Sequence, residues 1–347
     1  MKKLLPILLI GHMSHLAADT ALDTATQNRR ISELEDRYAT HIERITPPTS
    51  PRDGSRWGLS LSGSALYWTA RLGSLSYAQS GNGTLGTTVT PGRNYTVDWG
   101  YDPGFKAGIG IVTGYDGWDL LLDYTWLRSS ATGSASGDLV PVTSFPTSSL
   151  VKATSSYTHY LNALNFEIGR SYFISPKLVM RPAAGLKGAW CTDRITNQYL
   201  RTSSDTYLYD ASEFDGQHDW GIGIRGAFGT SWHLTDSFSI VGDVALSAIW
   251  SQFKLTHRAT STDQATGTVT TFEYIRQGFH TVRPVTELDI GFKWEQWYLN
   301  HRFHIAVDVK WETQVWFDNT YIIRGDRQTE SYNLTTQGLT AGLRLDF

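Results

Sequence analysis

One stretch of the chain combines acidic side chains with an imidazole. Asp210, Asp215, His218 and Asp219 lie within ten residues of one another, and a carboxylate beside a histidine is a common pair for general acid–base chemistry. Such chemistry requires groups held within hydrogen-bond reach, which spacing alone does not establish. A loop rich in aspartate is usually just solvated. We therefore expect no enzyme activity and assign no catalytic residue.

The remaining histidines and the single cysteine indicate neither a metal site nor a redox site. The other candidate histidines are His159, His257, His280, His301 and His304. They are scattered, and no two of them form an i, i+4 pair on a helix. Cys191 is the only cysteine, so the chain has neither an internal disulfide nor a Cys-x2-Cys metal motif. We expect no metal and no cofactor.

A third group consists of charged residues that stand at every second position of otherwise apolar stretches. Side chains with this period share one face of a β-strand. If the apolar face meets lipid, the charged face lines the lumen of a barrel. The expected lumen-lining charged residues are Asp119, Asp123, Glu167, Arg181, Lys187, Arg225, Asp243, Glu287, Asp289, Lys293, Asp308, Lys310, Glu312 and Arg344. The two signs nearly balance, which favours salt bridges across the lumen over a ring of one sign that would select ions.

Ten stretches show this period of two. Their apolar positions lie in 57–67, 105–111, 118–126, 160–168, 178–190, 220–228, 238–250, 282–294, 303–315 and 339–347. Short turns follow the second, fourth, sixth and eighth stretches, and long polar loops follow the odd-numbered ones, including 129–155, 202–217, 259–271 and 319–331. A soluble sandwich has no reason to sort its loops by length, whereas outer-membrane barrels have short periplasmic turns and long outer loops. Both termini would then lie on the periplasmic side.

Composition agrees with strands rather than helices as the spanning elements. The chain has 13 Trp, 17 Tyr and 14 Phe, as expected for aromatic belts at the membrane interfaces. Mean hydropathy is −0.28, and no apolar run after the N-terminus reaches the ~18 residues that a membrane helix needs. The 30 basic and 33 acidic residues give no nucleic-acid footprint. The predicted fold is all-β: a transmembrane, antiparallel, up-and-down β-barrel of about ten strands.

The N-terminal region has two predicted parts. Residues 1–18 have the basic start and the apolar core of a secretory signal peptide. Residues 19–56 form a periplasmic segment in which 28–45 is amphipathic, and Pro47, Pro48 and Pro51 end the helix. This short helix is either a coiled-coil segment or a solvated linker helix. The barrel then covers 57–347, and its last strand pairs with its first.

Two segments and the C-terminal strand resemble a known family. They are Arg181-Pro-Ala-Ala-Gly-Leu-Lys-Gly-Ala-Trp190, then Gly221-Ile-Gly-Ile-Arg-Gly-Ala-Phe-Gly-Thr-Ser-Trp232 continued by Phe238-Ser-Ile-Val-Gly-Asp243, and the last ten residues. With Trp311–Phe317, their order and spacing resemble the major outer membrane proteins of Legionella and of the chlamydia-like environmental bacteria. The resemblance implies an abundant barrel in the bacterial outer membrane with a porin or structural role. Some chlamydial relatives are rich in cysteine and cross-linked, and this chain departs from that pattern.

Two functions follow as predictions. The first is a porin-like channel for ions or small solutes that is also an abundant surface component. The alternative is a structural or adhesive surface protein whose lumen is filled by side chains. Expected partners are outer-membrane lipid, lipopolysaccharide and the barrel-assembly machinery, which would recognise the terminal Phe347 as its signal. A homo-oligomer and a host-cell or surface ligand are compatible with either function, and nucleic acid is not expected.

Overall fold

The computed structural model describes residues 27–34, 57–73, 75–80, 92–113, 116–142, 150–202, 208–263, 265–298, 303–323 and 329–347. Residues 27–34 are helical and exposed, and Arg29 and Glu33 approach within 3.5 Å one turn apart. The predicted signal peptide and the rest of the predicted helix lie outside the described residues. No helix in the described ranges is long and apolar enough to cross a membrane.

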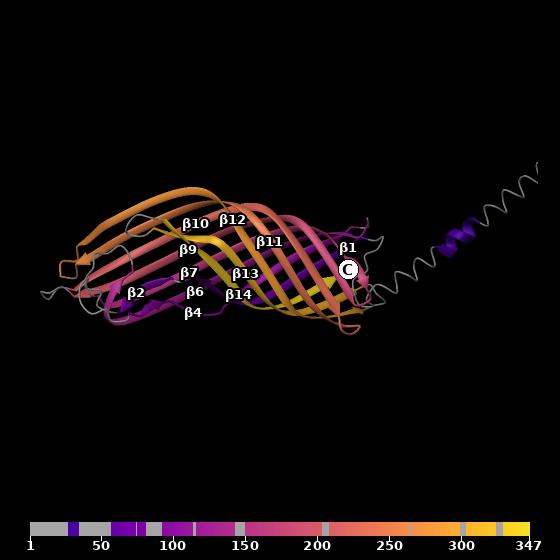
Figure 1. Cartoon of the computed structure of the whole chain (residues 1–347), viewed down its shortest axis with the longest axis horizontal. Coiled ribbons are helices and arrows are strands. Elements are labelled where there is room, and N and C mark those ends of the chain that lie inside the picture. The colour runs from indigo at the N-terminus through magenta and orange to yellow at the C-terminus, as the bar shows by residue number, and fades with distance from the viewer. Residues whose placement is uncertain are drawn as a thin grey trace, which may run out of the picture.

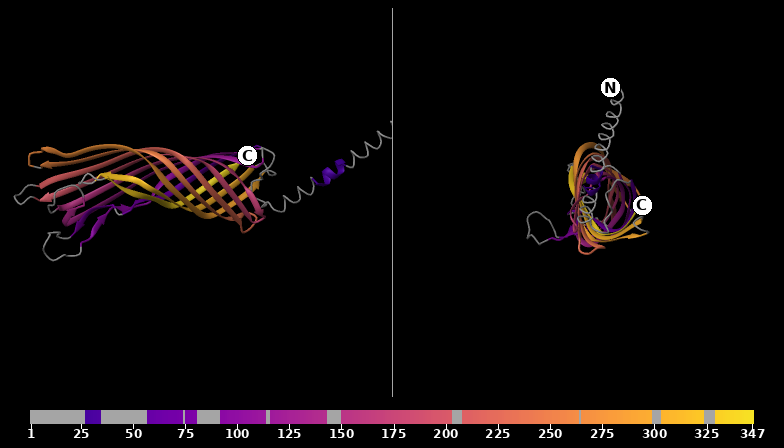
Figure 2. Two further views of the ribbon diagram at one scale, coloured as in Figure 1. Left: turned by 45° about the horizontal axis from the view of Figure 1, so that its top comes forward. Right: turned by 90° about the vertical axis from the view of Figure 1, so that its right-hand side faces the viewer.

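Ten antiparallel strands close into a ring (Figures 1 and 2). In chain order they are β1 (Gly58–Leu72), β5 (Asp102–Val112), β6 (Trp118–Pro141), β7 (Leu150–Arg170), β9 (Leu178–Thr202), β10 (Leu208–His233), β11 (Phe238–Asp263), β12 (Val269–Tyr298), β13 (Phe303–Ile323) and β14 (Thr329–Asp346). Each strand pairs with the next, and β14 pairs with β1 in a register that places Leu61 opposite Leu345. The prediction of a ten-stranded up-and-down barrel is confirmed.

The predicted turns explain how neighbouring strands reverse direction. Asp116 and Gly117 have φ values of 53° and 69°, a left-handed conformation that helps the chain reverse direction in a short loop between two strands. Thr113 and Trp118 close this turn with a 2.8 Å bond from the backbone N–H to the carbonyl oxygen. Short β8 (Tyr172–Ser175) lies beside the next short turn and pairs with β9.

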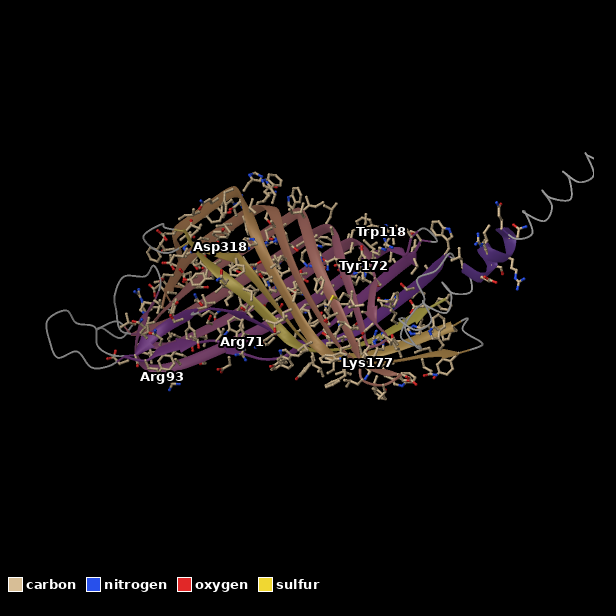
Figure 3. The ribbon with its side chains drawn as sticks, turned by 45° about the vertical axis from the view of Figure 1, so that its right-hand side comes forward. Arg71, Arg93, Trp118, Tyr172, Lys177 and Asp318 are labelled. Atoms are coloured by element: carbon tan, nitrogen blue, oxygen red, sulfur yellow. The ribbon has the colours of Figure 1, made fainter. Side chains whose placement is uncertain are left out.

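An apolar band surrounds the lengthwise half of the barrel that carries the short turns. In β11 it runs from Phe238 to Trp250, whose side chains are 54% and 48% exposed. These twelve residue steps, at about 3.4 Å each and a tilt of about 40°, correspond to roughly 30 Å, which is the thickness of a bilayer core. Trp118 and Tyr172 lie near the short-turn end of the barrel (Figure 3), as predicted for an aromatic belt. At the other edge of the band, Trp250 stacks on His280, with ring centroids 4.9 Å apart.

The strands do not stop at the outer edge of this band. β6 continues to Pro141, and β7 begins at Leu150, so most of the loop predicted at 129–155 is a paired hairpin. The loops predicted at 202–217, 259–271 and 319–331 are likewise mostly strand. In the hairpin of β6 and β7, small and polar residues alternate, because the outer face meets water and the inner face packs alanine side chains into the core. Such a composition resembles that of a loop. We call this outer part of the barrel, beyond Trp250 in β11, the extension.

Three short strands complete the wall of the extension where β1 and β5 end. They are β2 (Ser76–Ser80), β3 (Asn94–Thr96) and β4 (Asp98–Trp99). β2 and β4 both pair with β6, and β3 pairs with β2. The side chains of Tyr77 and Val97 in this segment are buried in the core of the extension. This segment therefore closes the side of the extension that β1 and β5 leave uncovered.

Candidate functional site

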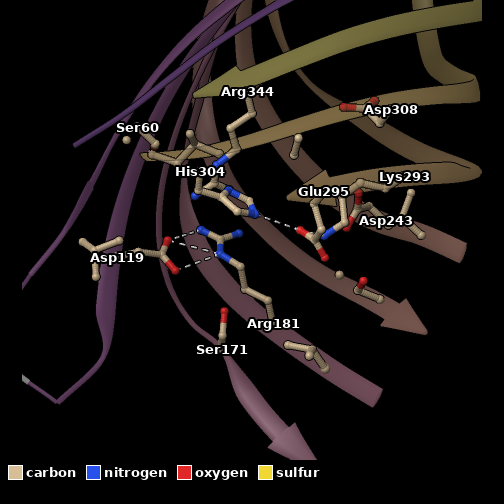
Figure 4. A pocket seen from close by; sticks show the side chains of 18 of the residues that line it. Ser60, Asp119, Ser171, Arg181, Asp243, Lys293, Glu295, His304, Asp308 and Arg344 are labelled. Atoms are coloured by element: carbon tan, nitrogen blue, oxygen red, sulfur yellow. Dashed lines mark hydrogen bonds and ion pairs between the residues drawn. The ribbon is translucent and has the colours of Figure 1, made fainter. Parts of the chain in front are cut away.

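The half of the lumen nearer the short turns contains a cavity of about 360 Å³ (Figure 4). Four of the predicted lumen residues line this cavity: Asp119, Arg181, Lys293 and Arg344. The period of two along their strands predicts that they lie on the inner face. A second cavity of about 260 Å³ lies further along the lumen and shares Arg181 and other wall residues with the first. Together the cavities form a polar vestibule.

A network of ion pairs crosses the vestibule. Arg181 binds Asp119 at 3.0 Å and Glu167 at 3.1 Å. Arg225 binds Glu167 at 2.8 Å and also pairs with Glu287. These five residues come from β6, β7, β9, β10 and β12, so the network links half of the ring. Arg225 and Glu167 are the most buried pair of this network, with side chains 9% and 7% exposed, and removing either one would leave its partner's charge largely uncompensated, at a cost of about 3–5 kcal/mol.

The other predicted lumen residues extend this network. Lys187 is buried and binds Glu287 at 2.8 Å and the Asn165 side-chain oxygen at 3.0 Å. Asn165 in turn donates to Asp123 at 3.0 Å. Lys106, which shares this face, pairs with Glu312.

A separate group surrounds Lys310 at the vestibule wall. The Lys310 ammonium lies 3.6 Å from Asp289 and 3.9 Å from Asp243, and Asp308 lines both cavities. Nearer the short turns, Lys293 binds Glu295 at 2.9 Å. The structure thus places all fourteen sequence-derived lumen residues on the inner face. Both signs alternate across the space, and no ring of one sign appears among the described residues.

Aromatic side chains close the lumen above the vestibule. Trp68 and Trp316 are both 0% exposed, although each lies on the inner face of its strand. Lys106 lies over the Trp68 ring at 5.0 Å, and Lys187 lies over the Trp316 ring at 5.2 Å. Arg283 covers the Trp316 ring at 5.1 Å. Cations over aromatic faces stabilise desolvated contacts of this kind. The vestibule therefore ends at a packed layer.

Strand β13 reinforces this closure because it leaves the wall. β12 and β13 pair only from Tyr298–Phe303 to Val285–Trp316, although both strands continue beyond that point. Asp318 has a φ of 47°, a left-handed conformation uncommon for residues other than glycine. Past this kink, residues 320–323 of β13 pair with β14 alone. We call residues 317–323 and 329–334 the inward hairpin.

The inward hairpin contacts strands on the far side of the barrel. Gln217 of β10 donates to the Asn319 carbonyl at 2.6 Å and accepts from the Tyr321 N–H at 2.8 Å. Thr320 donates to Asp193 of β9 at 2.9 Å, and Arg283 binds the Asn319 side chain at 2.8 Å. Asn319 is fully buried. These bonds hold the hairpin across the lumen, beyond Trp68 and Trp316.

A compact acidic group lies in the extension, outside the apolar band. His257 of β11 is fully buried, and its Nδ1 lies 2.7 Å from Asp215 Oδ1. Its Nε2 lies 3.5 Å from Glu273 Oε2 and 4.0 Å from Glu213 Oε1. Burial alone would lower the pKa of His257, but the bond to Asp215 and the charges of Asp215, Glu213 and Glu273 raise it above its usual value. The site therefore favours a positive charge on or beside the imidazole.

Within the described part of the acidic stretch, His218 pairs with neither Asp215 nor Asp219. Asp215 and Asp219 face the lumen, where Asp219 binds Arg283 at 2.7 Å. His218 faces outward and contacts the Thr192 hydroxyl at 3.0 Å. Asp210 lies on β10, and its side chain is outside the described part.

Sequence reasoning missed the closing residues and the acidic group. Trp68 and Trp316 stand at lumen-facing positions of their strands. A large aromatic residue at a lumen-facing position could have indicated from the sequence that the lumen is closed. Glu213 and Asp215 share a face, but bringing His257 between them required the register of β10 on β11.

The C-terminal residue closes the barrel at the end that carries the short turns. The Phe347 N–H donates to the Leu59 carbonyl at 2.9 Å, and the Leu59 N–H donates back at 3.2 Å. The Phe347 ring packs on Phe303 with a centroid distance of 5.2 Å and is 56% exposed. The last side chain is therefore at the rim, where its ring faces outward.

A polar lumen inside a lipid-facing band of ten antiparallel strands defines an outer-membrane β-barrel. Residues 49–347 match the family model described as the Legionella pneumophila major outer membrane protein precursor, and the chain belongs to this family. The predicted family and the predicted location in the bacterial outer membrane are confirmed. Comparison with curated protein sequences gives no match.

Several solved structures are similar at low identity. The outer membrane protease OmpT from Escherichia coli is 10% identical, with 84% of this chain and 97% of that chain covered and a TM-score of 0.42. A major outer membrane protein from Thermus thermophilus is 10% identical, with 84% and 99% covered and a TM-score of 0.28. The P. putida toluene transporter TodX is 9% identical, with 87% and 92% covered and a TM-score of 0.23. Similarities this low carry no argument about function.

Proposed function

We propose that this protein is a surface component of the outer membrane whose lumen is closed to solutes in its resting state. The observation that carries this proposal is the complete burial of Trp68, Trp316 and Asn319 in the centre of the barrel. A water-filled pore would leave side chains in these lumen-facing positions wet. The extension, with its continuous wall and core, is then the part that acts at the cell surface in a structural or adhesive role.

The packing of the extension supports this role. Tyr157, Tyr199, Leu139 and Leu150 are almost completely buried there and belong to one apolar core with Trp68 and Trp316. A channel mouth needs a hydrated interior, whereas this interior is packed like that of a soluble domain. Such a core makes the extension a rigid platform for its outermost hairpins.

A gated pathway for ions or small solutes is the second candidate function, and the vestibule favours it. The two cavities hold water-accessible charges of both signs, which a purely structural barrel does not require. Residues 320–323 of β13 pair with β14 alone, so the inward hairpin can move without breaking a strand ladder to β12. Movement of the hairpin would join the vestibule to the outside, and the near balance of charge predicts weak ion preference.

The proposed role involves no enzyme activity, and its partners follow from the surface. The apolar band would contact lipid and lipopolysaccharide, and the terminal strand ending in Phe347 would be recognised by the barrel-assembly machinery. A homo-oligomer and a host-cell or surface ligand for the extension are further proposals. A nucleic-acid partner is not proposed, because the charge of the chain is near balance.

Planar-bilayer recording of the refolded full chain tests the proposal. We expect no steady current from the wild-type protein. A variant that carries Trp316→Ala and has Asn-Gly in place of residues 319–332 should conduct, because both closing layers are then reduced. Trp311→Ala is the matched control, since this tryptophan lies on the same strand but faces outward. A steady wild-type current equal to that of the opened variant would refute the closed lumen and support an open porin.

A further inference from the structure

The acidic group in the extension has a feature that the closed-barrel function does not use. His257 is fully buried, and its Nε2 makes no hydrogen bond within the described part of the chain. A buried ring nitrogen without a hydrogen bond normally costs stability. This nitrogen points between two carboxylates, Glu213 of β10 and Glu273 of β12, at 4.0 and 3.5 Å. Two carboxylates facing one buried ring nitrogen favour positive charge at the point where the three groups meet.

The orientation of the imidazole matches that of a metal ligand. Asp215 lies 2.7 Å from Nδ1, so the neutral ring carries its proton on Nδ1 and directs its Nε2 lone pair at the two glutamates. A carboxylate that orients a histidine in this way is the common second partner of metal-binding histidines. Asn197 donates to Glu213 Oε2 at 3.2 Å, which orients that carboxylate with Oε1 toward the histidine.

The distances suit a small transition-metal ion. Bonds of about 2.0–2.1 Å from zinc to nitrogen and to oxygen place neighbouring donor atoms about 3.3 Å apart in a tetrahedral site. The observed separations of 3.5 and 4.0 Å from Nε2 exceed this spacing, so both glutamate side chains would shift toward the histidine and toward each other to share one ion. One imidazole with two carboxylates suits zinc better than calcium or magnesium, which prefer oxygen ligands alone. The Glu273 side chain is 17% exposed, so water can complete the shell and an ion can enter.

We propose that His257, Glu213 and Glu273 bind one zinc ion in the extension, with Asp215 as the positioning residue for the histidine. The ligands come from three neighbouring strands, β10, β11 and β12. Zinc therefore links the wall of the extension at the level where these strands stand clear of the membrane. The proposed surface role would use this link to stiffen the extension, but the site itself does not depend on whether the lumen is closed.

Isothermal titration of ZnCl2 into the chelator-treated, refolded full chain tests the site, with bound metal measured by mass spectrometry. We expect one zinc per chain and a rise in Tm of about 5 °C at ~100 times the Kd. His257→Asn should lower the affinity at least 100-fold, and Asp215→Asn should lower it by about 10- to 100-fold. His218→Asn is the matched control, because His218 lies on the outer face of β10, and its affinity should equal that of the wild type.

Three outcomes would overturn the proposal: no zinc bound by the wild-type protein, equal zinc binding by His257→Asn, or loss of zinc in His218→Asn. Should His257→Asn fail to fold, Glu273→Gln replaces it, because this side chain is partly exposed and keeps its shape. Unchanged zinc affinity in folded Glu273→Gln would then refute the assigned ligand set. Bilayer current plays no part in this test, so the zinc site and the closed lumen can fail independently.

Discussion

Gln217→Ala should release the inward hairpin, because one side chain makes two of the bonds that hold it. Gln217 donates to the Asn319 carbonyl at 2.6 Å and accepts from the Tyr321 N–H at 2.8 Å. Each bond between uncharged groups contributes about 0.5–1.5 kcal/mol net, so the two together contribute about 1–3 kcal/mol. The population in which the hairpin has left its site should therefore rise by about 5- to 150-fold.

Hydrogen–deuterium exchange measured by mass spectrometry tests this magnitude. Amides of residues 319–323 should exchange faster in Gln217→Ala by the same factor, because their exchange requires the hairpin to open. Gln252→Ala is the matched control. Gln252 is one strand away and accepts from Trp220 on the outer face at 2.9 Å, so its loss should leave the hairpin unchanged. Equal exchange in wild type and Gln217→Ala, or equal acceleration in both variants, would refute the reasoning.

Three further predictions concern stability and assembly. Trp316→Ala should lower the free energy of unfolding by about 3–5 kcal/mol, measured by denaturant titration in micelles, whereas Trp311→Ala on the lipid face should lower it less; equal losses would contradict the buried closing layer. Gly223→Ala should reduce the yield of folded, heat-modifiable barrel, because a Cβ there would lie 1.9 Å from a carbonyl oxygen of the next strand, while Gly226→Ala meets nothing within 4 Å and should fold normally; normal folding of both would show that the strands can separate. Deletion of Phe347 should impair outer-membrane assembly, and wild-type amounts of heat-modifiable protein in the outer membrane would show this expectation wrong.

The barrel could be predicted from the sequence because its two faces differ in chemistry. In β13, Val307 and Val309 face lipid while Asp308 and Lys310 face the lumen, and a period of two is visible without any tertiary information. The closing strand was predictable for the same reason, and its pairing with β1 follows from the need to leave no free edge inside a membrane.

The extension was harder to predict because its outer face is in water. Ala131, Ala135 and Ala153 are buried there, but alternation of small and polar residues gives little contrast. The long strands were therefore predicted as loops. A stretch of serine, threonine and alanine can form a loop or a strand. Here the pairing of β6 with β7 along most of their length shows that it forms strands.

The inward hairpin and the acidic group depend on contacts between distant segments. Asn319 is 102 residues from Gln217 along the chain, and His257 is 42 residues from Asp215. No local pattern specifies that β13 leaves the wall after Trp316. The kink at Asp318 has a positive φ, which aspartate tolerates better than most residues but which its sequence neighbours do not announce.

Cross-linking within intact outer membranes tests most directly whether the hairpin closes the lumen. In a Cys191→Ser background, Asp193→Cys with Thr320→Cys places two thiols where side chains now lie 2.9 Å apart. We expect a short thiol cross-linker to join them in high yield, with the linked peptides identified by mass spectrometry. If β13 instead continued in the wall beside β12, the register that pairs Val285 with Trp316 would bring residue 320 opposite Thr281. Cross-linking of Thr281→Cys to Thr320→Cys, with none between positions 193 and 320, would contradict the closed lumen.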